Sequence, residues 1–396
     1  PAAAHDLMNE VHPIRTVQYL SRIDERDGGV VRFVLNFCDD LARRGHQVTL
    51  LTQDDRDVPA AWRDAGGGKP QVVTAPLPTN PVARLSDETN RTVDRLLAES
   101  QLLHLHCLWD PANIALASHC RAAGVPYVVS AHGMLNDWAL RLKRLKKLAY
   151  LAVGGKKLLR QAARVHCASN GERQQVAEHL PDDNLAVVPL SFDGEAFGQL
   201  PGADAARARW PVLADNVPAV LSLGRLHPVK RYELLVDALA ILHNEGLKAH
   251  LLLAGPAEEP TYLAQLERQI ASLGLSRSVH FLGTVTGAEK VSLYQACDVF
   301  ALASWQECFG IVLAEALAAE TPIVTTRSVD TWPELQRAGG VIVDDNSAAF
   351  AAALNGLLRD SQERRALGEQ GRKYVLDWLE PDRVLAAWED VYRGVL

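Results

Sequence analysis

Two glutamates with seven residues between them, Glu307 and Glu315, lie in the stretch "SWQECFGIVLAEALAAETPIV" (304–324). On one continuous helix they would point about 80° apart, because each helical residue turns the chain by about 100°. We therefore place Glu307 in a strand-to-helix loop and Glu315 about two turns into the following helix. Glu315 could then bind a distant group of a ligand, such as ribose hydroxyls. The alternative is a loop glutamate favoured by the helix dipole and a solvated glutamate further along the helix.

The residues between these glutamates could bind a ligand through the backbone. Gly310 has no side chain to keep a ligand away from the loop. The amides of Phe309, Gly310 and Ile311 stand at the expected helix start, where N–H groups have no partner within the helix. Such amides donate well to ligand oxygens.

A second group of residues is basic and lies in "LSLGRLHPVKRYELLVDAL" (221–239). An expected strand ends at Gly224, and Arg225 and Lys230 follow in the loop or at the next helix start. Two cations beside a helix N-terminus suit a diphosphate. Lys230 and Arg231 are adjacent and should point different ways, so only one is expected in the site. The alternative is a solvated basic loop.

The first half of the chain holds weaker candidates. Gly28 and Gly29 precede an expected helix in "YLSRIDERDGGVVRFVL" (19–35) and would allow a phosphate close to the backbone, although on this motif alone a plain flexible loop is the better interpretation. His132, followed by glycine in "VVSAHGMLNDWAL" (128–140), ends a strand and is a candidate cleft residue, although a lone histidine is more often structural. His104 and His106 alternate on one face of another strand.

Residues 141–160, "RLKRLKKLAYLAVGGKKLLR", interleave leucines with cations. Between Asp137 and Glu172 there are nine Lys or Arg and no Asp or Glu. This pattern resembles an interfacial amphipathic helix and predicts contact with an anionic membrane surface. A solvated basic helix and a docking face for an anionic acceptor are the alternatives.

The sequence predicts no metal site. Its cysteines form no C-x-x-C pair, so reduced thiols in a cytosolic protein are expected. The six cysteines are Cys38, Cys107, Cys120, Cys167, Cys297 and Cys308.

Strand-like and helix-like stretches alternate along the chain, which predicts parallel sheets with helices on both faces. The expected strands of the first series are 15–20, 46–52, 101–106, 126–131, 163–169 and 185–190; those of the second are 218–224, 249–255, 278–283, 298–304, 321–326 and 340–345. Residues 191–217 interrupt the rhythm and look like a linker region. The sequence predicts a first domain over 1–190, a second over 191–379, and a last helix, 380–396, that crosses back to the first. Ligands should bind beyond the carboxyl ends of the strands, where two such sheets would face each other across a cleft.

The bulk composition fits this picture. The chain has 396 residues, enough for about two domains, with 48% hydrophobic and 22% charged residues. Its net charge of −7 argues against nucleic-acid binding. No apolar run is long enough to span a membrane, and the start "PAAAHDL" does not look like a signal peptide.

Taken in order, these motifs resemble family 4 of the glycosyltransferases, retaining nucleotide-sugar enzymes of the GT-B fold. A Gly-rich loop and His-Gly are followed by G-R-x4-K, G-P-A-E-E-P-x-Y-L, F-L-G-x-V and E-x-F-G-x4-E-A-L-A. The resemblance covers nearly the whole chain and is strongest over 218–326. The stretch "SAHGMLNDWALRLKRLKKLAY" resembles a bacterial subgroup that builds exopolysaccharide, capsule or lipopolysaccharide.

The resemblance implies roles for the matching residues. Arg225 and Lys230 would hold the donor diphosphate, and Glu315 the ribose. Glu307 and the amides of Phe309 and Gly310 would bind the sugar hydroxyls, and His132 would lie beside the sugar. Gly28 and Gly29 would approach the diphosphate, and the base would lie near Thr284, Val285 and Thr286. After "IVTT" the family's common Gly-Gly is replaced by "RSVDTWPEL", and Glu320 stands where a helix-ending glycine is common.

The implied function is the transfer of a hexose-type sugar from a UDP- or GDP-linked donor to a hydroxyl of a glycan, glycolipid or small molecule. The resemblance implies retention of configuration, no cofactor and no metal. The expected location is the cytoplasm, with peripheral contact on the inner face of the cell membrane. A catalytically silent binding subunit, a sugar-phosphate synthase and an epimerase remain alternatives.

Overall fold

The computed structural model describes residues 12–24, 28–63, 68–80, 84–215 and 217–396, and the chain folds into two compact units. Unit 1 comprises Pro1–Ser191 and Asp382–Leu396, and unit 2 comprises Phe192–Pro381. The N-terminal stretch on which the signal-peptide prediction rests lies outside the described residues. Among the described residues, no helix is long and apolar enough to cross a membrane.

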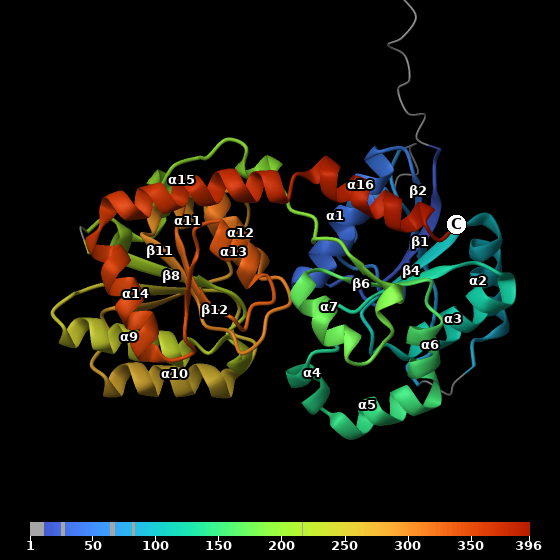
Figure 1. Cartoon of the computed structure of the whole chain (residues 1–396), viewed down its shortest axis with the longest axis horizontal. Coiled ribbons are helices and arrows are strands. Elements are labelled where there is room, and N and C mark those ends of the chain that lie inside the picture. Colours follow the sequence, from blue (N-terminus) through green and yellow to red (C-terminus); the bar gives the residue numbers. More distant parts are fainter. Residues whose placement is uncertain (1–11, 25–27, 64–67, 81–83, 216) are drawn as a thin grey trace, which may run out of the picture. The chain divides into compact units, whose positions relative to one another are not determined.

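Unit 1 is built on a parallel sheet with the strand order β3-β2-β1-β4-β5-β6-β7 (Figure 1). Its strands are β1 Arg15–Tyr19, β2 Gln47–Thr52, β3 Gln71–Thr74, β4 Leu102–His106, β5 Tyr127–Ser130, β6 Arg164–Cys167 and β7 Leu185–Val187. Its helices are α1 Gly29–Arg43, α2 Asp87–Glu99, α3 Pro111–Ala123, α4 Asp137–Arg141, α5 Arg144–Tyr150, α6 Lys156–Arg160, α7 Asn170–Ala177 and α16 Pro381–Arg393. The short edge strand β3 was missing from the predicted strands.

Unit 2 contains a second parallel sheet with the order β10-β9-β8-β11-β12-β13. Its strands are β8 Ala219–Leu223, β9 His250–Ala254, β10 Val279–Gly283, β11 Val299–Leu302, β12 Ile323–Thr326 and β13 Val341–Val343. Its helices are α8 Asp204–Arg209, α9 Tyr232–Asn244, α10 Pro260–Ser272, α11 Gly287–Ala296, α12 Ile311–Ala318, α13 Trp332–Arg337, α14 Ser347–Arg359 and α15 Ser361–Trp378. The predicted class, two doubly wound α/β domains with the last helix on the first, is confirmed.

The interpretation of 191–217 as a linker region was wrong. Residues 192–215 are part of unit 2, where Phe197 and Leu213 are buried. The amide of Ala206 donates to the hydroxyl of Ser292 on α11 at 3.0 Å. Its Gly, Pro and Ala content suggested a linker, but a few buried apolar side chains are enough to anchor it.

Helix α16 is fixed to unit 1 by aromatic and polar contacts. Figure 1 shows it, in red, beside the blue α1. Trp388 packs on Phe37 of α1, with 4.9 Å between ring centroids. The hydroxyl of Tyr392 lies 2.8 Å from Nδ1 of His104 and accepts from the side-chain Nε2 of Gln18 at 3.1 Å. Strand β4 therefore supports the last helix through buried polar side chains.

These polar contacts continue as a chain of hydrogen bonds through the sheet. Nε2 of His166 lies 2.8 Å from the carbonyl oxygen of Val188, which can only accept, so Nε2 carries the hydrogen. Nδ1 of His166 then accepts from Ser130, and Ser130 accepts from Nε2 of His104, each at 2.8 Å. The chain requires a neutral His166, because its Nδ1 must accept the hydroxyl of Ser130. Burial holds the pKa of His166 down, at about 4, and also lowers the pKa of His104.

We expect unit 1 to lose stability as the pH falls below about 6.5, the ordinary histidine pKa. Below this pH the histidines of the unfolded chain become protonated, whereas the buried imidazoles stay neutral. Each such histidine therefore lowers the free energy of unfolding by about 1.4 kcal/mol per pH unit until its folded pKa is reached. Urea unfolding at pH 7, 6 and 5 measures the slope, and His166→Gln should reduce it by about one proton. A free energy of unfolding that is constant from pH 7 to 5 would contradict this explanation.

Candidate functional site

The candidate site in unit 2 lies where the order of its strands reverses. Strand β8 pairs with β9 on one side and with β11 on the other, and the carboxyl ends of β8 and β11 lead into the loops 224–231 and 303–310. In doubly wound sheets this is where ligands bind, because the following helices leave in opposite directions. The amide of Trp305 donates to the carbonyl of Val229 at 2.8 Å, which joins the two loops directly.

Arg225 is held by a carboxylate from the next loop of the sheet. Its Nη1 lies 2.8 and 2.6 Å from the two carboxylate oxygens of Glu258, which follows β9. Both side chains are about two-fifths exposed. The guanidinium is therefore accessible, and an anionic ligand could replace Glu258. The sequence interpretation missed this partner.

Lys230 and Glu307 form an ion pair across the two loops. The hydroxyl of Ser304 lies 3.5 Å from the same carboxylate oxygen of Glu307. Lys230 is 14% and Glu307 24% exposed, so the pair is largely screened from water. As predicted, the neighbouring Arg231 points elsewhere: it pairs with Asp345.

The loop that carries Glu307 is braced by the segment after β12. The amide of Glu307 donates to the carbonyl of Ser328 at 3.0 Å, and its carbonyl accepts from the amide of Asp330 at 2.8 Å. The hydroxyl of Thr331 also donates to the carbonyl of Phe309 at 2.6 Å. "RSVDTWPEL", which departs from the family pattern, thus has an evident role in fixing this loop.

Helix α12 starts later than the sequence suggested. Gly310 is its N-cap and adopts the left-handed conformation, with φ of 72°. An added Cβ would lie 3.0 Å from Leu313 and 3.1 Å from Val329, so both the conformation and the tight packing favour glycine. Glu315 consequently lies just over one turn into the helix rather than two. In this described region, the amides of Phe309, Gly310 and Ile311 form none of the backbone hydrogen bonds, which leaves them to ligand oxygens.

Glu315 is held by helix α11. Its two oxygens accept from Lys290 Nζ at 2.6 Å and from the hydroxyl of Tyr294 at 2.9 Å. Both Lys290 and Glu315 are about one-eighth exposed. Burial and the neighbouring carboxylate raise the pKa of Tyr294, so its hydroxyl stays a donor. Each carboxylate oxygen can accept a further hydrogen bond, as ribose binding would require.

Thr284, Val285 and Thr286, the residues expected near the base, connect β10 to α11. Val285 is buried, and Thr286 is the N-cap of α11. The same helix carries Lys290, so this loop and Glu315 are linked through one rigid element. The base and ribose assignments stay predictions.

In unit 1, Gly28 and Gly29 form the start of α1. Gly28 is the N-cap with φ of 84°, a conformation that favours glycine, whereas Gly29 is helical. An added Cβ at either position would meet nothing within 4 Å. The backbone therefore faces open space here, as a phosphate-binding loop needs, and contact with the diphosphate stays a prediction.

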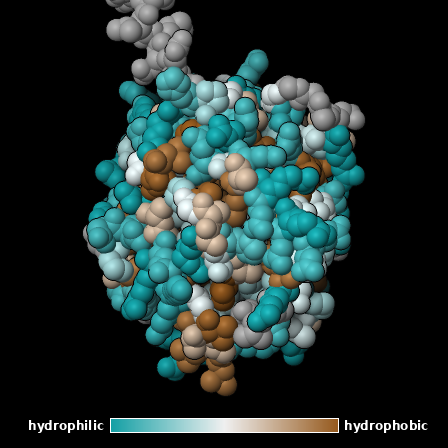
Figure 2. All heavy atoms as spheres, turned by 90° about the vertical axis from the view of Figure 1, so that its right-hand side faces the viewer, coloured by the Kyte–Doolittle hydropathy of each residue, from teal (hydrophilic) through white to brown (hydrophobic). Residues whose placement is uncertain are grey.

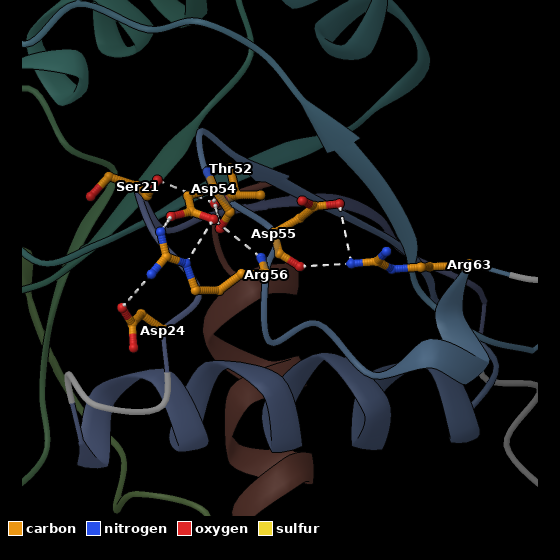
Figure 3. Close-up of polar contacts among 7 residues, drawn as sticks. All are labelled: Ser21, Asp24, Thr52, Asp54, Asp55, Arg56 and Arg63. Atoms are coloured by element: carbon orange, nitrogen blue, oxygen red, sulfur yellow. Dashed lines mark hydrogen bonds and ion pairs between the residues drawn. The ribbon is translucent and has the colours of Figure 1, made fainter.

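A polar cluster lies where β1 and β2 end (Figure 3). Asp24, only 2% exposed, lies 3.3 Å from Arg56, which also pairs with Asp54 at 2.8 Å. The hydrogen bond from Arg56 lowers the pKa of Asp54. The hydroxyl of Thr52 lies 3.2 Å from the carbonyl of Ser21. The segments that follow β1 and β2 are thus tied together.

His132 lies in a tight turn directly after β5, with φ of 49°. Its Nε2 is 3.3 Å from Nδ1 of His106. Burial and the neighbouring His166 lower the pKa of His132 to about 3, so it is a neutral hydrogen-bonding group at physiological pH. The following amide, Gly133, donates at 2.6 Å to Glu172, a buried carboxylate that the sequence interpretation missed.

Glu172 fixes the position of this turn. Its other oxygen accepts from the amide of Ala168 at 2.6 Å, so it joins the ends of β5 and β6. Burial raises the pKa of Glu172, and the two amide donors oppose that shift. Glu172 is therefore a positioning residue for His132.

The basic stretch 141–160 is not one continuous amphipathic helix. It is divided into α4, α5, a π-helical turn at Leu151–Gly155 and α6. Leu142 is extended and Lys143 adopts the left-handed conformation, which separates α4 from α5. The bend still exposes apolar side chains among the cations: Leu142, Leu145, Leu148 and Val153 are between 47% and 83% exposed.

Comparisons with known proteins agree with this architecture. Residues 27–195 match the family described as Glycosyltransferase Family 4, and residues 204–374 match Glycosyl transferases group 1. A D-inositol 3-phosphate glycosyltransferase of Kineococcus radiotolerans is 29% identical, over 87% of this chain and 86% of that protein. A lipopolysaccharide core biosynthesis glycosyltransferase, LpsE of Rhizobium meliloti, is 25% identical, over 92% and 95%.

A solved structure has the same fold. HepE of Anabaena, crystallised with UDP-glucose, superposes with a TM-score of 0.77 at 20% identity, over 96% of this chain and 99% of that one. The two family matches together cover most of both units. The fold is GT-B, and the chain belongs to family 4 of the glycosyltransferases.

Proposed function

We propose that this glycosyltransferase moves a hexose-type sugar from a nucleotide-diphosphate sugar, UDP- or GDP-linked, to a hydroxyl of a glycan, glycolipid or small molecule. The observation that carries the proposal is the pair of cations, Arg225 and Lys230, on the loop after β8, each held by a carboxylate that a diphosphate could replace. The UDP and UDP-glucose complexes of HepE support a nucleotide-sugar donor. Relatives such as LpsE support a role in exopolysaccharide, capsule or lipopolysaccharide synthesis.

The ion pairs suggest how the donor would bind. A diphosphate that takes over Lys230 releases Glu307, whose carboxylate can then accept from sugar hydroxyls. The unpaired amides at the start of α12 would donate to sugar or phosphate oxygens. Glu315, already oriented by Lys290, would accept from the ribose. Binding thus exchanges one set of charge pairs for another.

The bond-breaking step needs charge stabilisation more than acid or base catalysis. Cleavage of the anomeric C–O bond places negative charge on the departing diphosphate, beside Arg225 and Lys230. In the proposed retaining reaction the acceptor hydroxyl attacks from the face that the diphosphate leaves, and the diphosphate takes the proton. Neutral His132 would contribute a hydrogen bond to the sugar rather than a charge.

The first experiment is a thermal-shift screen of nucleotide sugars, because a tight donor stabilises the folded protein by mass action. Transfer and donor hydrolysis are then measured with the best donor. Stabilisation without hydrolysis or transfer would favour the alternative of a silent binding subunit. No stabilisation by any nucleotide sugar would reject the proposed donor class.

We expect Arg225→Ala and Lys230→Ala each to lower kcat/KM by the equivalent of about 2–4 kcal/mol, the scale for removal of a preorganised charge stabiliser. Folding should survive, because neither side chain belongs to the apolar core. Arg277→Ala, on an exposed turn of the same unit, is the matched control. Turnover like the wild type in either variant would reject the diphosphate contact.

We expect full activity in excess EDTA. The charge on the diphosphate is assigned to Arg225 and Lys230, and the described residues contain no group of three or more His, Cys, Asp or Glu placed to hold a metal ion. Steady-state transfer is compared with and without chelator. Loss of transfer that magnesium or manganese restores would refute metal independence.

We further propose peripheral contact with an anionic membrane through residues 141–160, at the inner face of the cell membrane. Exposed leucines among cations support it, since each basic residue near an anionic surface adds about 1 kcal/mol. We expect sedimentation with vesicles of anionic but not neutral lipid, falling steeply with salt. Reversal of Lys143, Arg144, Lys146 and Lys147 to Glu should abolish it and preserve donor binding. If the charge-reversed variant binds anionic vesicles as well as the wild type does, this surface has no role in membrane contact.

A further inference from the structure

A pocket of about 600 Å³ opens in unit 1 between the bent segment α4–α6 and the end of α7. Its floor contains Leu135, Leu159 and Leu180, all less than 10% exposed. Partly exposed Leu148 and Leu151 continue this apolar lining toward the surface. The volume is that of an ordinary small-molecule site.

The lining of this pocket is strongly basic. It includes Arg141, Arg144, Lys147, Lys156 and Arg160, against one acidic residue, Glu178. Lys147 is engaged: it donates to the carbonyl of Ala139 and lies 4.8 Å from the centre of the Trp109 ring. Burial accordingly lowers its pKa.

The other four cations of the lining have no carboxylate partner within the part of the chain that the structure describes. This differs from the donor-site candidate of unit 2, where Arg225, Lys230 and Lys290 are each paired with a glutamate. The chain has a net charge of −7, yet no acid of its described part pairs with these four cations. The pocket therefore offers an unsatisfied positive rim above an apolar floor.

We propose that this pocket binds, one molecule at a time, an amphiphile in which a phosphate group adjoins an apolar chain. The phosphate would accept from the cationic rim, where bidentate arginine contacts are strong, and the chain would lie on the leucines. This is the chemistry of a lipid-linked acceptor and equally of a membrane phospholipid. The inference deepens the proposed function by naming an acceptor class, and it differs from a diffuse membrane surface because it requires a bounded site.

Exposed apolar residues surround the same region. Figure 2, which views the molecule from the right-hand side of Figure 1, shows apolar side chains gathered at its lower end. This is the height at which α5 lies in Figure 1. Leu145 is 83% and Leu148 51% exposed, but only Leu148 lines the pocket. Lys143 and Lys146 likewise lie in the basic stretch and outside the lining. The chain thus supplies matched controls for charge and for hydrophobicity.

The test is titration calorimetry of the full chain with decyl phosphate below its critical micelle concentration, with decanol and inorganic phosphate measured separately. No donor nucleotide is present, so failure here is distinct from failure of the transfer reaction. We expect decyl phosphate to bind at least tenfold more tightly than either part alone. Arg144→Glu with Lys156→Glu should weaken it at least tenfold, as should Leu148→Ser; tenfold corresponds to about 1.4 kcal/mol.

The controls decide between a pocket and a diffuse surface. Lys143→Glu with Lys146→Glu makes the same charge change, and Leu145→Ser the same loss of apolar area, and both should bind within about twofold of the wild type. Equal loss in the control and pocket variants would overturn the proposal and leave only a membrane surface. Decyl phosphate that binds no better than decanol or phosphate would overturn it as well.

Anionic vesicles then identify the source of the amphiphile. If vesicle binding also falls in Arg144→Glu with Lys156→Glu and survives in Lys143→Glu with Lys146→Glu, the pocket takes phospholipid from the bilayer. If both pairs weaken vesicle binding alike while only the first weakens decyl phosphate, the pocket serves a separate lipid-linked ligand. Each result supports a bounded site and assigns its occupant.

Discussion

The reversal of strand order between β8 and β11 is the constraint on which the candidate site of unit 2 depends. Parallel strands buried on both faces leave only their carboxyl ends for polar chemistry. At that edge the loops after β8 and β11 meet through the contact between Val229 and Trp305, and each carries one half of the Lys230–Glu307 pair. Without the reversal, helices would cover the place where these loops meet.

Charge pairing then determines what the site can do. Arg225, Lys230 and Glu315 are all paired within the protein, so none stands as a bare charge beside the apolar sheet. Burying an unpaired charge is expensive, whereas exchanging one anionic partner for another costs much less. A protein carboxylate and a ligand phosphate are such exchangeable partners. The arrangement therefore stabilises the charged side chains without closing the site to an anionic ligand.

The sequence was sufficient for the features that local chemistry fixes. Apolar runs alternating with helix-like stretches predicted nearly all strands to within a few residues. The predicted strand ends placed Arg225, Lys230 and Glu307 in the loops where the structure has them. It failed where partners lie far apart in the chain: Lys290 meets Glu315 across 25 positions, and Glu258 meets Arg225 across 33. Periodicity has no means of pairing such residues.

Backbone conformation was the second source of error. The helix start at Gly310 and the break at Lys143 depend on positive φ values. A glycine in a sequence indicates that a positive φ is possible, whereas a lysine gives no such indication. Glu320, standing where the family commonly has glycine, also has a positive φ, of 66°. The turn after α12 is therefore required by the fold even when the residue that favours it is missing.

The two units treat polar groups in opposite ways, and this bears on what each can bind. The sheet of unit 1 buries neutral imidazoles in a hydrogen-bonded chain from Val188 to Tyr392, which fixes α16 but offers no charge. The bent segment 141–160 of the same unit carries cations among exposed leucines, and four cations of its pocket lining have no carboxylate partner among the described residues. Unit 2 keeps its cations paired at the sheet edge. The paired cations of unit 2 suit a water-soluble polyanion, and the cations among leucines in unit 1 suit an anion carried on an apolar chain.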